Sequence, residues 1–181
     1  VLFVIDNSKN DSISNLCRDP RIRYIFNNEN VGFGAAHNIA FREIPELGSS
    51  YHLVLNPDVY FDSSVIEELI VKADSDASIG LIMPKILYAN GSTQHLCKLI
   101  PTPIDLFFRR FVFNNIFKTR RTDRYELKFL SYEEEVETPI VSGCFMFLNT
   151  TFLQEIEGFD ERFFMYLEDV DLCRRIGGLS R

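Results

Sequence analysis

Short apolar runs alternate along the chain with amphipathic segments, as in proteins built from alternating strands and helices. The apolar runs predict strands at 1–5, 22–26, 53–55, 81–86 and 140–148. Helical spacing predicts helices at 34–41, 65–73 and 151–156, and a last helix from 167 or 168 to 177. Ser64 and Glu67 match a capping box at the start of the second helix. The pattern predicts an α/β fold with a mostly parallel central sheet flanked by helices.

Polar residues directly follow two of the predicted strands. Asp6 ends the first strand, and Asn56 and Asp58 follow the third within an Asn-Pro-Asp sequence. Ligands of such sheets bind beyond the carboxyl ends of the strands, and carboxylates there can hold a divalent cation. Asn-Pro-Asp is also a favourable turn, and Asp6 can cap the following loop as well as bind a ligand. The residues alone leave these alternatives open.

A glycine-containing loop leads into the first predicted helix. It carries Asn30, Gly32, Gly34 and Asn38, and backbone N–H groups at such a helix start can hold phosphate. The dinucleotide fingerprint G-x-G-x-x-G is not met, because His37 stands at its third glycine position. This disfavours a nicotinamide-dependent dehydrogenase. His37 itself is expected to be packed or hydrogen-bonded rather than catalytic.

The run from 159 to 175 places carboxylates among aromatic residues. These acids are Asp160, Glu161, Glu168, Asp169 and Asp171. Burial beside aromatic rings raises the pKa of a carboxylate and suits it to accept a proton. The alternative is that acids in a first helical turn are stabilised by the helix dipole, with Asp171 paired to Arg175. We adopt that alternative for Asp171, and we expect Asp160 and Glu161 to shape the turn after Gly158.

Composition narrows the class of protein. The chain has 181 residues, enough for one domain, and its net charge of −7 disfavours nucleic acid as a partner. Its four cysteines lack the spacing of metal or redox motifs and are expected to be buried free thiols in a reducing cytosol. No apolar run approaches the roughly 20 residues that span a bilayer.

The chain begins within a strand and stops just past a helix, so we expect an internal piece of a longer protein.

The segment 103–124 differs from the rest of the chain. It is rich in Phe and carries six basic residues against two acidic ones. An amphipathic basic helix can lie on an anionic membrane surface. Alternatively, its Phe face covers the core and its Arg side chains are solvated. Both interpretations stay open.

Five segments in order resemble the family 2 glycosyltransferases of GT-A fold, within them the rhamnosyltransferase-like bacterial members. They are VIDNS at 4–8, NENVGFGAAHN at 28–38, LNPDV at 55–59, SGCFMF at 142–147 and GFDERFFMYLEDVDLCRR at 158–175. The last segment is the most specific. The resemblance implies a single GT-A domain over residues 1–181, a Rossmann-like fold of nucleotide-diphospho-sugar transferases. That domain is expected to be incomplete, because the family's first strand and its C-terminal part are missing.

The resemblance also implies the reaction. The expected enzyme is an inverting hexosyltransferase of bacterial cell-surface polysaccharide biosynthesis. It would transfer a sugar from a dTDP-rhamnose or UDP-hexose type of donor to a saccharide or lipid-linked saccharide. It would work in the cytoplasm, with a possible peripheral contact to the inner face of the plasma membrane through 103–124.

Residue roles follow from the same resemblance. Asp169 would be the general base, and Glu168 is its neighbour and the second candidate. Asp58 would hold Mg²⁺ or Mn²⁺, with Asn56 in place of the first Asp of the family's D-x-D motif. Asp6 would bind the nucleobase. The other implied substrate-binding residues are Asn7, Asn30, Gly32, Gly34, Asn38, Asn56, Gly143 and Cys144.

Two other classes remain open from the sequence. A non-catalytic domain would bind the sugar nucleotide without turnover. A nucleotidyltransferase would share the α/β sheet and the divalent metal but release pyrophosphate. The basic, glycine-rich loop expected at the start of a nucleotidyltransferase is not found in the sequence.

Overall fold

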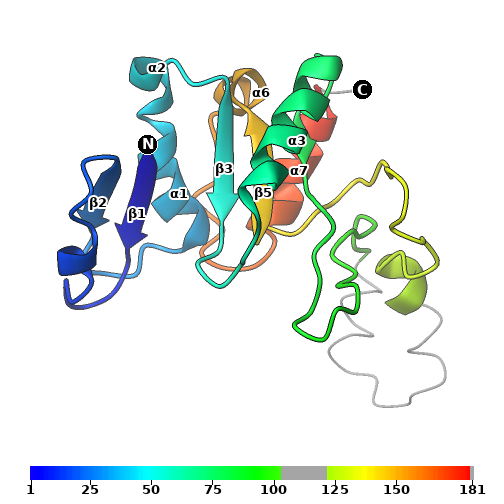
Figure 1. The fold of residues 1–181 in the computed structure, drawn as a ribbon, viewed down its shortest axis with the longest axis horizontal. Helices are drawn as coiled ribbons and strands as arrows, with labels where there is room; N and C mark the ends of the chain where they lie inside the picture. Colours follow the sequence, from blue (N-terminus) through cyan, green and yellow to red (C-terminus); the bar gives the residue numbers. More distant parts are fainter. Residues whose placement is uncertain (103–121, 180–181) are drawn as a thin grey trace.

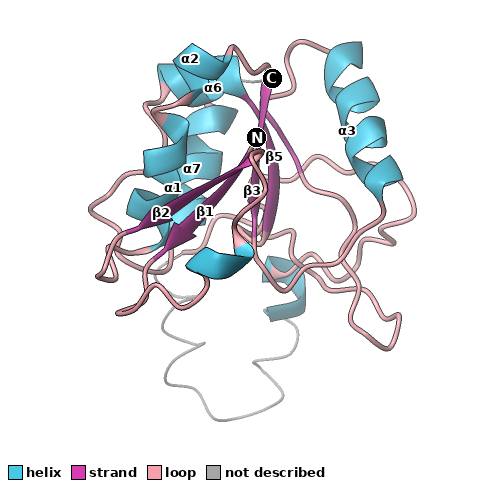
Figure 2. Ribbon diagram, turned by 60° about the vertical axis from the view of Figure 1, so that its left-hand side comes forward, coloured by secondary structure: helices cyan, strands magenta, loops and turns pink. Residues whose placement is uncertain are grey.

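The computed structural model of the protein describes residues 1–102 and 122–179. Strands form a central layer with helices on both faces (Figure 2). Helices α1 (Phe33–Phe41), α6 (Thr150–Glu155) and α7 (Glu168–Gly177) cover one face, and α3 (Ser63–Ser75) covers the other. The predicted α/β class is therefore confirmed.

The strands form two sheets in the described part of the chain. In the first, β1 (Leu2–Asp6) pairs in parallel with β2 (Ile22–Phe26). In the second, β5 (Phe145–Asn149) lies between β3 (Tyr51–Leu55) and β4 (Leu81–Ile82) and is antiparallel to both. The expected mostly parallel sheet is thus only partly present. A continuous apolar run indicates a buried strand, but it does not determine the direction of that strand.

Most predicted elements are present, with shifted ends. The last helix begins at Glu168, as expected, and α1 begins one residue before its predicted start. β4 has only two residues, and two further short helical elements are η1 (Ser14–Leu16) and α2 (Ile44–Leu47). The capping box of Ser64 and Glu67 was wrong. Asp62 is the N-cap of α3, and its carboxylate accepts a hydrogen bond from the Ser64 N–H at 2.9 Å.

β5 lies at the centre of the hydrophobic core. Its side chains alternate between the two faces, as the pleat of a strand requires. Met146 and Leu148 pack in the cluster formed with α7 and α6, whereas Phe145 and Phe147 pack with α3. Neither cluster contains a residue of β1 or β2 among the described residues.

Two histidines lie within an aromatic group beside this core. The His37 ring lies 4.5 Å from that of Phe33, and the His52 ring lies 4.5 Å edge-on from that of Phe41. Phe41 in turn stacks on Phe159 at 5.6 Å. Burial lowers the pKa of His37 to about 4, and burial together with the charge of His37 lowers that of His52 to about 4. The expectation that His37 is a packed histidine is confirmed.

We expect the free energy of unfolding to fall as the pH drops from about 6.5 to 4. The folded pKa of each histidine lies below its ordinary value of 6.5, so the unfolded chain binds more protons in this window. The loss amounts to at most roughly 3 kcal/mol per histidine. Urea unfolding at pH 7, 6 and 5 measures it. His37→Phe and His52→Phe should each weaken this pH dependence, and an unchanged slope in both variants contradicts the assignment.

Three other expectations concern the chain as a whole. The four cysteines were expected to be buried free thiols. All four are free, but only Cys173 is buried, and the other three are partly exposed. Residues 103–121 of the basic segment lie outside the described residues, and 122–125 form one helical turn. Among the described helices, none has the length and apolar character needed to span a membrane.

Candidate functional site

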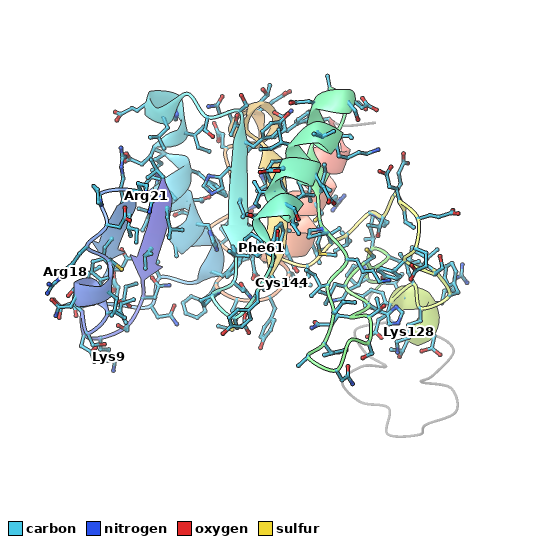
Figure 3. The ribbon with its side chains drawn as sticks, viewed as in Figure 1. Lys9, Arg18, Arg21, Phe61, Lys128 and Cys144 are labelled. Carbon is cyan, nitrogen blue, oxygen red and sulfur yellow. The ribbon has the colours of Figure 1, made fainter. Side chains whose placement is uncertain are left out.

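The carboxyl ends of β1 and β3 lie at the same edge of the strand layer, since both strands run in the same direction in Figure 1. β5 begins at this edge because it is antiparallel to β3. Figure 3 shows Cys144, the residue before β5, at the end of β3. The Asn56 N–H donates to the Cys144 carbonyl oxygen at 2.9 Å. This edge therefore gathers Asp6, Asn56 and Cys144 as predicted.

Asp6 is a buried carboxylate with two partners inside the protein. Its Oδ1 accepts from the Ser8 N–H at 2.9 Å and its Oδ2 from the Tyr24 hydroxyl at 2.6 Å. The bond from Tyr24, followed by those from Ser8, holds the pKa of Asp6 below its usual value. The role as a cap of the following loop is confirmed. A carboxylate has about four lone-pair sites, more than these partners occupy, so Asp6 can still accept a bond from a ligand. Binding of a nucleobase by Asp6 stays a prediction.

Three asparagines connect the end of β1 to the glycine loop. Asn27 donates to the Asn7 side-chain oxygen at 2.8 Å, and Asn7 donates to the Asn30 side chain and to the Gly32 carbonyl, each at 3.4 Å. The Gly32 N–H donates to the Asn30 side-chain oxygen at 3.0 Å. The structure thus brings Asn7, Asn30 and Gly32 together. The sequence interpretation did not include Asn27, although it follows β2 as Asn7 follows β1.

The two glycines of this loop, Gly32 and Gly34, pack against the beginning of the acidic run 159–175. A Cβ atom on Gly32, whose φ is +92°, would lie 2.6 Å from the Phe164 carbonyl oxygen. A Cβ atom on Gly34 would lie 2.9 Å from the Phe159 Cβ. The Phe33 N–H donates to the Phe164 carbonyl at 3.2 Å. Both glycines therefore permit close packing, and the Phe33 N–H is used within the protein rather than for phosphate.

Asn38 connects α1 to the turn that precedes the acid pair. The side chain is 6% exposed. Its Nδ2 donates to the Phe159 carbonyl at 2.8 Å and to Glu161 Oε1 at 2.9 Å, and its Oδ1 accepts from the Phe159 N–H at 2.9 Å. Both ends of the amide are occupied by this turn. Asn38 therefore positions this turn, and its role in substrate binding stays a prediction.

The acid pair stands at the start of α7. The half-buried Asp169 accepts from the Gly143 N–H at 3.4 Å through Oδ2 and from the Val170 N–H at 2.8 Å through Oδ1. Glu168 is 8% exposed, and its buried Oε2 has no hydrogen-bond partner in the described part of the chain. Burial, and to a lesser degree the charge of Asp169, raises the pKa of Glu168. Asp169 is thus accessible beside Gly143, while Glu168 is enclosed.

The other acids of the run are structural, as expected. Asp171 pairs with Arg175 at 2.7 Å, and Arg175 also donates to the Gly158 carbonyl at 2.8 Å. Asp160 pairs with Arg162 at 2.6 Å, and the bonds from Arg162 lower the pKa of Asp160 to about 2. The sequence interpretation did not predict that Arg175 binds the turn at Gly158.

Asp58 is an exposed carboxylate in a turn after β3. The Val59 N–H donates to the Asn56 carbonyl oxygen at 3.2 Å, which confirms the turn interpretation of Asn-Pro-Asp. In residues 1–102 and 122–179, no group of three or more His, Cys, Asp or Glu side chains is arranged to hold a metal. Mg²⁺ is often bound by one or two carboxylates together with substrate phosphates. Asp58 therefore fits a metal shared with a diphosphate better than a site formed by the protein alone.

Residues 1–156 match the family model described as glycosyl transferase family 2. The chain is 27% identical to an N-acetylglucosaminyl-diphospho-decaprenol L-rhamnosyltransferase of Mycobacterium tuberculosis, over 97% of this chain and 60% of the relative. It is also 27% identical to the low-salt glycan biosynthesis hexosyltransferase Agl10 of Haloferax volcanii, over 95% of this chain and 52% of the relative. The chain thus spans 60% or less of the length of these curated relatives.

Proposed function

The chain belongs to glycosyl transferase family 2, and on this basis we propose that it transfers a sugar from a nucleoside diphosphate to an acceptor hydroxyl. The proposed fold is the GT-A arrangement. One similar protein is named a rhamnosyltransferase and the other a hexosyltransferase, which supports a dTDP-rhamnose or UDP-hexose donor. The name of the first includes a diphospho-decaprenol, which supports a lipid-linked saccharide as acceptor and a role in polysaccharide synthesis.

The observation that carries this proposal is the placement of Asp169. It is half-buried at the edge where β5 begins, and it accepts from the Gly143 N–H, whose residue packs against the Phe33 ring. In an inverting displacement the acceptor oxygen attacks the anomeric carbon, and the bond from that carbon to the diphosphate oxygen breaks. Asp169 accepts the proton of the attacking hydroxyl. This step uses no protein nucleophile, so the free thiol of Cys144 has a role near the sugar rather than a covalent one.

The donor half of the site is formed by β1 and the glycine loop. Asp6 and Asn7 would contact the nucleobase, and the hydrogen bonds among Asn7, Asn30 and Gly32 tie the loop to the end of β1. Asn56 and Asp58 would contact the diphosphate. Mg²⁺ or Mn²⁺ on Asp58 would neutralise the charge that develops on the leaving diphosphate.

A donor panel with the full-length protein tests the proposal. UDP-glucose, UDP-N-acetylglucosamine and dTDP-rhamnose are incubated with an acceptor saccharide and Mg²⁺ or Mn²⁺, and the released nucleotide is measured. Release of a nucleoside diphosphate is the expected result. Binding without release supports the non-catalytic alternative. Release of pyrophosphate in a parallel incubation with UTP or dTTP and a sugar 1-phosphate supports a nucleotidyltransferase.

Asp58→Asn is expected to remove the effect of Mg²⁺ on donor binding. With Asp58 present, the cation should strengthen binding of the diphosphate about tenfold, because it reduces the repulsion between the negatively charged carboxylate and the phosphates. Calorimetry with and without Mg²⁺ measures this without turnover. Glu155→Gln on α6 removes an exposed carboxylate elsewhere and serves as the matched control. An undiminished Mg²⁺ effect in Asp58→Asn contradicts the metal assignment.

A further inference from the structure

Four consecutive apolar side chains are exposed directly before the acid pair. We call Phe164–Leu167 the apolar lip. Its members are 54%, 51%, 78% and 40% exposed, in chain order. Contiguous exposed apolar surface is a common mark of an interaction site.

The backbone of the apolar lip is strained. Tyr166 and Leu167 have φ of +70° and +72°, in the left-handed region, which is unfavourable for residues other than glycine. Leu167 is also the N-cap of α7, and it provides no side-chain hydrogen bond to the helix. Two successive residues held in this region cost free energy, and such strain is kept mainly at functional sites.

Hydrogen bonds at both ends of the lip maintain this conformation. The Phe164 carbonyl accepts from Phe33 N–H at 3.2 Å, and the Leu167 carbonyl accepts from Asp171 N–H at 2.9 Å. The Tyr166 side chain between them, the most exposed of the four, projects from a fixed backbone. The backbone of the lip is therefore held in one conformation, so a partner would not need to order it on binding.

The position of Asp169 defines that partner. A hydroxyl that gives its proton to Asp169 must come within about 2.6–3.2 Å of the carboxylate. The sugar ring that carries this hydroxyl then lies close to the apolar lip. A Cβ atom on Gly143 would lie 3.4 Å from the Phe33 ring and 3.6 Å from the Asp169 Cβ, so Phe33 is beside Asp169. The Phe33 N–H donates to the Phe164 carbonyl of the lip. Tyr166 is three residues before Asp169. Aromatic rings offer the flat apolar surface that matches the C–H face of a sugar ring.

We propose that Tyr166 packs against the acceptor sugar and that the apolar lip selects which sugar is accepted. This inference depends on the proposed transferase function and adds a specificity-determining residue to it. Tyr166 binds the acceptor, while the donor would bind at β1 and the glycine loop, whose Gly32 packs against Phe164 at the first end of the lip.

The charges beside the lip favour a neutral sugar over an anionic membrane. Anionic lipid surfaces attract clusters of several Lys or Arg side chains. Two of the three cations in residues 159–175 are already paired, Arg162 with Asp160 at 2.6 Å and Arg175 with Asp171 at 2.7 Å. Residues 159–175 therefore offer no such cluster beside the lip.

Fluorescence can test the lip without turnover, because these 181 residues contain no Trp. Tyr166→Trp introduces their one tryptophan at the proposed contact, and the signal is read as the difference from the unaltered protein. Methyl β-glycosides of glucose, N-acetylglucosamine and galactose and methyl α-rhamnoside, titrated in the presence of UDP or dTDP, should give a saturable change for at least one sugar. Tyr88→Trp, at a tyrosine that is 57% exposed outside the site, is the matched control and should not respond.

Two results of this titration overturn the proposal. The first is a response of Tyr166→Trp to phosphatidylglycerol vesicles but to no glycoside, which would make the lip a membrane contact. The second is the absence of any response, or an equal response in Tyr88→Trp. Failure of the transferase function is recognised separately, since the donor panel then yields no nucleoside diphosphate whatever the lip binds.

Steady-state kinetics give the second test. With the glycoside that responds most strongly, Tyr166→Ala should raise the acceptor KM about tenfold and leave the donor KM unchanged, as expected for loss of an aromatic contact. Tyr166→Phe keeps the ring and should behave like the unaltered protein. An unchanged acceptor KM in Tyr166→Ala, or an equal rise in both KM values, overturns the assignment.

Discussion

Replacing Asp169 with Asn is expected to lower kcat by about 10²–10⁴-fold, the usual contribution of a general base. The amide keeps the shape of the side chain, and its oxygen can still accept from the Gly143 N–H, 3.4 Å away in the structure. It cannot accept the proton of the acceptor hydroxyl. Donor binding, measured by calorimetry, should therefore be unchanged while nucleoside diphosphate release with acceptor is lost.

Two variants in the same helical turn control this experiment. Asp171→Asn alters an acid that pairs with Arg175 and should keep nearly full kcat. Glu168→Gln tests the second candidate, which is enclosed and therefore less accessible to an acceptor. A normal kcat in Asp169→Asn rules out Asp169 as the base. A loss confined to Glu168→Gln moves the role to Glu168.

Asn38→Ala is expected to lower the free energy of unfolding by about 3 kcal/mol, because it leaves buried groups without partners. Those groups are the N–H and carbonyl of Phe159, each bonded to Asn38 within 2.9 Å. Urea unfolding near pH 7 measures the change.

Asn38→Asp should destabilise the fold further than Asn38→Ala. It places an oxygen where Nδ2 now lies 2.8 Å from the Phe159 carbonyl and 2.9 Å from Glu161 Oε1. The matched control is Asn10→Ala, at an exposed asparagine, with an expected change within about 0.5 kcal/mol. A loss below about 1 kcal/mol in both Asn38 variants contradicts the positioning role.

The local elements of this fold could be predicted because each depends on a few neighbouring residues. The helix that begins at Glu168 has acids in its first turn and basic residues in its last. The pairing of strands could not be predicted in the same way. Val54 pairs with Met146, far along the chain. The direction of β5 relative to β3 depends on the path that the residues between them take. The cap of α3 was misassigned because Asp62 and Ser64 are both good capping residues, and only the backbone of Asp62 distinguishes them.

The sequence identified the region of the candidate site better than the role of each residue. Asp6, Asn56 and Asp169 lie at the expected edge, because strand ends and a helix start determine where they lie. Asn38 and Gly34 have the residue types of a ligand-binding loop, yet they contact residues about 120 positions later. Such contacts are set by tertiary packing, which a motif does not record.

The separate sheet of β1 and β2 has a consequence for local unfolding. It adds no residue to either core cluster in the described part of the chain and shares no strand pairing there with the other sheet. Local opening of such a unit costs less free energy than unfolding of the whole protein. The strands that carry Asp6 and Asn7 can therefore open while the segment that carries Asp169 stays folded. Nucleotide binding would then reduce amide hydrogen exchange mainly in the less stable half of the molecule.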